Sequence, residues 1–182
     1  NRSEETLVSV YNAPDYTNIS KDFTINMAWH QVTGVAGNDT VYKMLSETKG
    51  LNVISPTWFF LKDDDGGIDS LATEAYVSHA HQNGLEVWGL VEDITHKDTI
   101  KDANIFNRTT SRQKLVSNLI AKAIQYDLDG LNLDCEYINT DSGRGYVQFI
   151  RELSIMCRIN DITLSVDNYV PTEYTRHYRR SA

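Results

Sequence analysis

The sequence lacks the marks of several protein classes. Its two cysteines, Cys135 and Cys157, provide neither a disulfide framework nor the spacing of a zinc site, and two buried free thiols are the simplest interpretation. No apolar run approaches the roughly 20 residues that a membrane-spanning helix needs. The first residues lack the hydrophobic core of a signal peptide. The chain begins as if cut from a longer precursor, so this last absence does not decide where the protein resides.

Positive charge is scarce as well. The chain has 25 acidic and 17 basic residues, a formal net charge of −8, and its short RHYRR run is too small to form a basic stripe. A nucleic-acid partner is therefore disfavoured. The glycine-rich nucleotide-binding patterns and the GxSxG of α/β hydrolases are also missing. With 182 residues, 41% of them hydrophobic, the chain is long and apolar enough for one sizeable domain.

A repeated pattern organises the chain. Four short segments each follow an amphipathic helical stretch and precede an apolar, β-prone run, and the first three contain a glycine suited to a helix C-cap. With an earlier run, FTINMAWHQV, they predict five strands about one βα unit apart. The four segments are KGLNV at 49–53, NGLEV at 83–87, DGLNL at 129–133 and NDITL at 160–164.

Strand–helix alternation predicts an α/β fold with a parallel sheet wrapped by helices. Helical periodicity is expected between the strands, at 39–48, 71–82, 111–126 and 143–159. A doubly wound sheet and a (β/α)8 barrel both fit, but the first turn lacks GxGxxG, which favours the barrel. Five strands cannot close an eight-stranded barrel. Either three βα units lie outside this chain, or the domain is a smaller α/β fold.

The acidic DDDGG run at 63–67 is most simply a solvated turn before a helix. A calcium-binding loop is the alternative, although further oxygen ligands at regular spacing are missing.

The fourth predicted strand, DGLNLDCEYI at 129–138, carries the chemistry. Strand alternation directs Asn132, Asp134 and Glu136 into the barrel, toward the carboxyl end of the strand where barrel enzymes place their active sites. Two carboxylates that are close and shielded from water cannot both ionise cheaply, so one pKa must rise. The result is a proton donor of the kind that glycosidic cleavage requires. The remaining side chains are expected to face the helices: Leu131, Leu133, Cys135 and Tyr137.

Other roles for this strand stay open. The carboxylates could belong to an ion pair or be buried for structural reasons alone. They could also bind a divalent metal such as magnesium, because Asp127 and Asp129 lie just upstream.

The segment DGLNLDCE at 129–136 resembles the DGxDxDxE signature of glycoside hydrolase family 18, whose chitinase-like members are (β/α)8 barrels with this motif on the fourth strand. The similarity covers nearly everything from residue 22 to 175. It points to the bacterial branch of spore-cortex and cell-wall N-acetylglucosaminidases of the SleL/YaaH type. Further matching runs are VISPTWFFL at 53–61, GLEVWGLVED at 84–93, YVQFIRELS at 146–154 and LSVDNYVP at 164–171.

The resemblance implies a retaining glycosidase that needs no cofactor. Glu136 matches the general acid, and Asp134 matches the residue that supports the substrate's 2-acetamido group, which attacks the anomeric carbon in place of a protein nucleophile. Asn132 stands where the family has its first Asp; it removes a charge but can still hydrogen-bond Asp134. Cys135 stands where an aromatic residue is common. The family's sixth-strand Met-x-Tyr-Asp run and eighth-strand Trp lie beyond Ala182 or do not exist.

Aromatic platforms are expected near the acid because sugar rings present apolar faces. Trp29, Trp58 and Trp88 lie on the first three predicted strands and are candidates for substrate binding. Asp167 and Tyr169, on the fifth, are candidate polar contacts.

Several other polar residues have less specific expectations. His30 is expected to be a structural histidine, and His79 and His81 to be surface residues. Glu92 and Asp93 end the third predicted strand and could cap the next helix.

We therefore expect a lead-in segment at 1–21 and, at 22–182, the first five βα units of a family-18-like barrel. Its partner would be an N-acetylglucosamine glycan, chitin-like or peptidoglycan, and the resemblance implies a location outside the cell or in the cell wall. The 182 residues alone need not be active, and the open sheet edges favour self-association. A non-catalytic carbohydrate-binding protein on this scaffold is the alternative. A dimerising half-barrel and a metal-dependent hydrolase are more distant ones.

Overall fold

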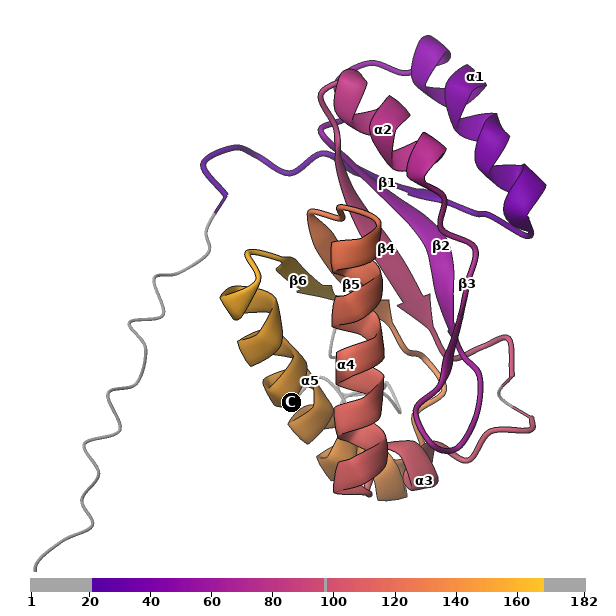
Figure 1. Ribbon diagram of the computed structural model, residues 1–182, viewed down its shortest axis with the longest axis vertical. Coiled ribbons are helices and arrows are strands. Elements are labelled where there is room, and N and C mark those ends of the chain that lie inside the picture. The colour runs from indigo at the N-terminus through magenta and orange to yellow at the C-terminus, as the bar shows by residue number, and fades with distance from the viewer. Residues whose placement is uncertain (1–20, 97, 169–182) are drawn as a thin grey trace, which may run out of the picture.

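The computed structural model describes residues 21–96 and 98–168. Its sheet contains the five predicted strands, all parallel and neighbours in chain order (Figure 1). A doubly wound sheet reverses its strand order, whereas this one does not, so the winding is that of a barrel. The strands are β1 (Met27–His30), β2 (Val53–Leu61), β4 (Glu86–Glu92), β5 (Gly130–Asp134) and β6 (Thr163–Val166).

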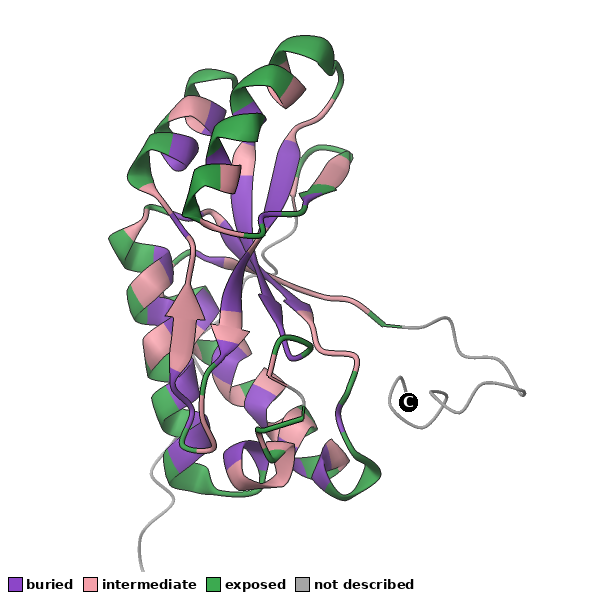
Figure 2. Ribbon diagram, turned by 90° about the vertical axis from the view of Figure 1, so that its right-hand side faces the viewer, coloured by how far each residue is buried: buried purple, intermediate pink, exposed green. Residues whose placement is uncertain are grey.

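The helices follow from this winding. Right-handed crossovers between strands that are neighbours in chain order place every helix on the same face of the sheet. Figure 2 shows the longer helices together on one side of the sheet. They fall on the four stretches where helical periodicity was predicted: α1 (Thr40–Glu47), α2 (Glu74–Gln82), α4 (Thr109–Gln125) and α5 (Gly143–Ile159). Three short elements complete the set: η1 (Val35–Asp39), α3 (Asp102–Phe106) and η2 (Thr140–Ser142).

A short strand that the sequence pattern did not predict, β3 (Ile68–Ser70), pairs antiparallel with the end of β2. The DDDGG turn therefore closes a hairpin, and the prediction that it precedes a helix is wrong. Asp63 Oδ1 accepts hydrogen bonds from the backbone N–H of Asp65 at 3.0 Å and of Gly67 at 2.8 Å, which closes the turn. A three-residue strand is too short for periodicity to detect.

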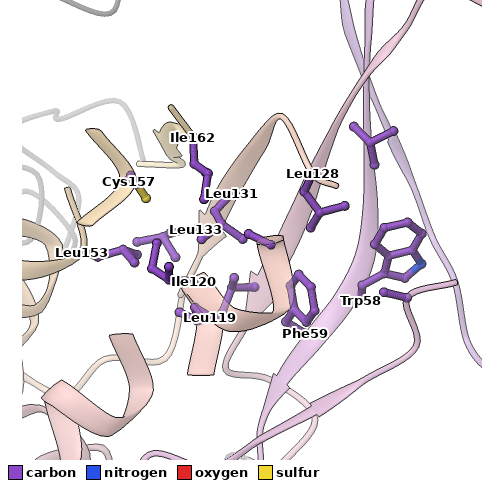
Figure 3. Packing of buried hydrophobic residues seen from close by; sticks show 14 of the residues in the cluster. Trp58, Phe59, Leu119, Ile120, Leu128, Leu131, Leu133, Leu153, Cys157 and Ile162 are labelled. Carbon is purple, nitrogen blue, oxygen red and sulfur yellow. The ribbon is translucent and has the colours of Figure 1, made fainter. Parts of the chain in front are cut away.

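The core lies between the sheet and the helix layer. Leu131 and Leu133 of β5 are fully buried there and pack among side chains of α4 and α5, such as Leu119 and Leu153 (Figure 3). Because side chains alternate along a strand, this packing turns Asn132 to the opposite face, which we call the inner face of the sheet.

The lead-in to β1 contacts the amino end of the sheet. Lys21 Nζ donates to Glu86 Oε1 at 2.7 Å, and Glu86 Oε2 accepts from Trp88 Nε1 at 2.9 Å. The predicted boundary at residue 21 stays a prediction, since residues 1–20 lie outside the described part of the chain. Within the described residues, no helix combines the length and hydropathy needed to cross a bilayer.

Candidate functional site

Asn132 is the centre of a hydrogen-bond network on the inner face. Its Oδ1 accepts from Trp29 Nε1 at 3.0 Å and from Ser55 Oγ at 3.1 Å. Its Nδ2 donates to Asp167 Oδ2 at 3.0 Å and to Ser165 Oγ at 3.4 Å. The amide is fully buried and uses its acceptor and donor atoms together. This network explains how a polar side chain is accommodated in the middle of a buried strand.

Two members of this network were not predicted. Ser55 and Ser165 are small polar residues within apolar strands, and Ser165 is the direct β6 neighbour of Asn132 in the sheet. A serine among apolar strand residues is the signal that could have identified them, since both follow the inner-face alternation.

Asp134 is the last residue of β5 and pairs in register with Glu92 of β4. Burial raises the pKa of Asp134 to about 6, and the negative charges of Glu136, Asp167 and Asp93 add to the effect. Burial, opposed by the hydrogen bond from Asn132, also raises the pKa of Asp167. The carboxyl groups of Asp134, Asp167 and Glu136 are therefore close enough to interact, and both burial and the nearby charges disfavour the ionised form of Asp134.

Glu136 lies beyond the strand. The prediction of a strand through residue 138 is wrong, because the β5 ladder ends at Asp134. Cys135 packs partly against the core and hydrogen-bonds the Tyr146 hydroxyl. Tyr137 is 45% exposed, so it does not face the helix layer as expected. Once the ladder ends, strand alternation no longer directs the side chains.

Glu92, the last residue of β4, and Asp93, which follows it, hold the loops around this site. Glu92 accepts hydrogen bonds from the backbone of Ile94 and Thr95 and from the Thr95 hydroxyl, so it caps the turn that follows β4. Asp93 instead accepts from the backbone N–H groups of Glu136 and Tyr137, each at 2.9 Å. Burial raises the pKa of Asp93 to about 6, although the backbone hydrogen bonds oppose the rise. No pattern within the sequence predicted this cross-strand role of Asp93.

The three tryptophans differ in their exposure and in the face of the sheet on which they lie. Trp29 keeps 61% of its surface exposed while its indole N–H is bonded to Asn132, so its ring is available on the inner face. Trp88 also faces inward, since a Cβ on Gly130 would approach its ring to 2.7 Å, but it is only 2% exposed.

Trp58 lies on the helix side of the sheet. It belongs to the core cluster with Ile54, its ring lies edge-on to Tyr76 with 4.8 Å between the ring centroids, and its Nε1 donates to Asn38 Oδ1 at 2.7 Å. The expectation that Trp58 lines an inner-face cleft is therefore corrected. The reason is strand alternation, because Ser55 already occupies the inner face three residues earlier.

His30 is a structural histidine, as expected. Its Nδ1 contacts the Tyr76 hydroxyl at 2.8 Å and its Nε2 contacts Thr40 Oγ1 at 2.7 Å, while burial lowers its pKa.

His81 was expected to be a surface residue, but it also makes a contact between separate elements. Its Nε2 lies 2.9 Å from Asp129 Oδ2, which also accepts from Val87 N at 2.7 Å, so this contact joins α2 to the start of β5. Across the described residues, no three histidine, cysteine or acidic side chains are placed to hold a metal ion. Tyr169 lies outside the described residues.

The fold and the site define a class of structure: the opening βα units of a (β/α)8 barrel with carboxylates at the carboxyl end of the fourth parallel strand along the chain. The sequence matches no family model and no curated protein sequence. Similar solved structures are nevertheless found, and they include chitinases and spore cortex-lytic enzymes.

Three of these structures illustrate the similarity. The spore cortex-lytic enzyme SleL of Bacillus megaterium has a TM-score of 0.68 at 14% identity, over 85% of this chain and 37% of that one. A chitinase of Chromobacterium violaceum has a TM-score of 0.64 at 14% identity, over 86% and 50%. A chitinase of Bacteroides thetaiotaomicron has 0.63 at 16% identity, over 85% and 50%. The chain thus spans half or less of these structures, and the likeness confirms the predicted fold.

Proposed function

We propose that this chain is part of a family-18-like glycoside hydrolase that cleaves β-linked N-acetylglucosamine glycans with retention. The observation that carries the proposal is the placement of Asp134 and Asp167 beside the Asn132 network, with the Glu136 charge close enough to raise the pKa values of both. The motif resemblance and the fold shared with chitinases and SleL support it. The activity, the glycan partner and a location outside the cell or in the cell wall all belong to this proposal.

In the proposed reaction, Glu136 acts as general acid and gives a proton to the glycosidic oxygen as the bond from that oxygen to the anomeric carbon breaks. The carbonyl oxygen of the substrate's own 2-acetamido group attacks the same carbon and forms a cyclic oxazolinium ion. Asp134 orients the acetamido group and stabilises the positive charge on its nitrogen, whereas Asn132, which was expected from the sequence to bond Asp134, bonds the neighbouring Asp167 instead. Water then attacks the anomeric carbon, Glu136 accepts its proton, and two inversions give net retention.

Substrate positioning is assigned to residues around these carboxylates. The exposed ring of Trp29 can stack on an apolar sugar face while Asn132 fixes its orientation. Asp167 is proposed as a polar contact. The assignments of Trp88, which is nearly fully buried, and of Tyr169, which lies outside the described residues, stay predictions.

The test is Glu136→Gln in the full-length protein, with a chito-oligosaccharide and peptidoglycan as substrates. Loss of the transferable proton is expected to lower turnover by about 10²- to 10⁴-fold while the circular-dichroism spectrum is unchanged. Glu47→Gln is the matched control, since Glu47 is exposed on α1 and only contacts Lys43 at 3.9 Å within the described structure. Undiminished turnover by the Glu136 variant would refute the assignment.

A non-catalytic carbohydrate-binding protein is the second candidate, and the exposed Trp29 ring is the observation that favours it. Titration of chito-oligosaccharide, followed by tryptophan fluorescence and by product analysis, distinguishes the two functions. Saturable binding without product would favour the binding protein, whereas shortened oligosaccharides would favour the enzyme.

A further inference from the structure

The loop that follows β5 carries Glu136 outside the sheet. The parallel ladder between β4 and β5 ends with the pair Glu92–Asp134, so it does not set the direction of the residues beyond. The far end of this loop is held by α3, because Asp102 accepts from Asn139 N at 2.6 Å and from Asn139 Nδ2 at 2.9 Å. A separate contact lies closer to Glu136 itself.

Asp93 provides that contact from the neighbouring strand end. Its Oδ1 accepts from Glu136 N and its Oδ2 accepts from Tyr137 N, both at 2.9 Å. The side chain is only 9% exposed, so water competes little for these two bonds. Two consecutive N–H groups bonded to one buried carboxylate fix the two peptide planes on either side of the Glu136 Cα, and with them the direction in which the Glu136 side chain leaves the backbone.

We infer that Asp93 is a positioning residue for Glu136. The inference rests on the proposed function, because it assumes that Glu136 is the acid and base of the reaction. A carboxylate is required at position 93, since each of its two oxygens accepts one N–H. Asparagine has one acceptor oxygen and would direct its own N–H₂ toward one of the two backbone donors.

Amide hydrogen exchange of the 182-residue chain, measured by NMR, tests the constraint without any assay of activity. In Asp93→Asn, the amides of Glu136 and Tyr137 are expected to exchange at least about tenfold faster, while those of Leu131 and Leu133 keep their wild-type rates. Asp64→Asn is the matched control, because Asp64 accepts from Lys101 N at 2.7 Å in a different loop. Unchanged rates at Glu136 and Tyr137 in folded Asp93→Asn overturn the inference.

The wild-type chain provides a second measurement if the variant does not fold. Glu136 N and Tyr137 N lie beyond the ladder and donate to Asp93, so protection of at least about 100-fold is expected at both amides. Exchange at the rate of unprotected amides would overturn the inference.

Kinetics of the full-length protein test the consequence for catalysis. Asp93→Asn is expected to lower kcat by about 100-fold and to leave KM within about twofold, because a misplaced acid affects the reaction more than substrate binding. Asp64→Asn is expected to leave both constants within about twofold of wild type. Faster exchange with an unaltered kcat would overturn the positioning role. A wild-type protein without any turnover would refute the proposed function instead, and the exchange data would still decide whether Asp93 fixes the loop.

Discussion

Asn132→Asp introduces the acidic residue that the glycoside hydrolase family 18 signature has at this position. The structure leads us to expect that this isosteric change is destabilising. Asn132 Nδ2 donates to Asp167 Oδ2 at 3.0 Å, so the variant places two carboxylate oxygens in contact. A hydrogen bond to a charged group contributes about 1.5–3 kcal/mol. The bonds that Asn132 Oδ1 accepts from Trp29 and Ser55 remain available, because one carboxylate oxygen can accept them.

The added repulsion is limited by protonation. Two charges about 3 Å apart repel by roughly 5 kcal/mol at an effective dielectric constant of about 20. One carboxyl can avoid this by taking up a proton, at a cost of at most about 4 kcal/mol at pH 7 from a reference pKa of about 3.9. Asp167 is only half-buried, and solvent screening reduces the repulsion. We therefore expect the free energy of unfolding at pH 7 to fall by about 2–4 kcal/mol.

The pH dependence gives the sharper test. In the variant the folded state raises the pKa of this carboxyl pair, so the folded state binds more protons than the unfolded state, and stability falls as pH rises above about 4. Below about pH 4 one carboxyl is protonated in both states and can donate to the other, so the loss relative to wild type is expected to shrink below about 1 kcal/mol.

Urea unfolding at pH 4 to 8, followed by tryptophan fluorescence, measures these differences. Asn118→Asp is the matched control, because Asn118 Nδ2 donates to the Gly66 carbonyl at 3.0 Å and not to a carboxylate. The control is expected to lose about 0.5–1.5 kcal/mol. Equal losses for Asn132→Asp at pH 4 and pH 7, or none at pH 7, would refute the argument.

Two further predictions concern stability. Burial raises the folded-state pKa of Asp134 to about 6, so this carboxyl destabilises the fold progressively as pH rises from about 4 through 6. Because the side chain is partly exposed and solvent screening reduces the effect, Asp134→Asn is expected to be only about 1 kcal/mol more stable than wild type at pH 7.5 and equal to it at pH 4. Calorimetry measures the Tm values, and a difference between variant and wild type that is the same at both pH values would contradict this. Trp58→Ala is expected to lose about 3–5 kcal/mol of unfolding free energy because Trp58 is fully buried, whereas Trp29→Ala loses less than about 1 kcal/mol but weakens glycan binding. The same denaturant titrations measure both tryptophan variants, and a similar cost for the two would show that their assigned faces of the sheet are wrong.

Much of the fold was predictable because it depends on local periodicity. The glycine-terminated helical stretches and apolar runs predicted all five parallel strands and the four longer helices. Alternation in β5 correctly directed Leu131 and Leu133 to the core and Asn132 to the inner face. These properties follow from the backbone geometry of a single element, which the sequence of that element encodes.

The sequence by itself thus determined the five parallel strands, the four longer helices and the side-chain directions of Leu131, Asn132 and Leu133 in β5. Only the tertiary structure decided where the β5 ladder ends, and that the backbone N–H of Glu136 bonds Asp93, 43 residues earlier in the chain. It also decided that His81 bonds Asp129 across a separation of 48 residues and that β3 pairs with β2. Partners of this kind are brought together by the packing of separate elements, and no periodicity within one segment encodes which residue of another segment will lie beside it.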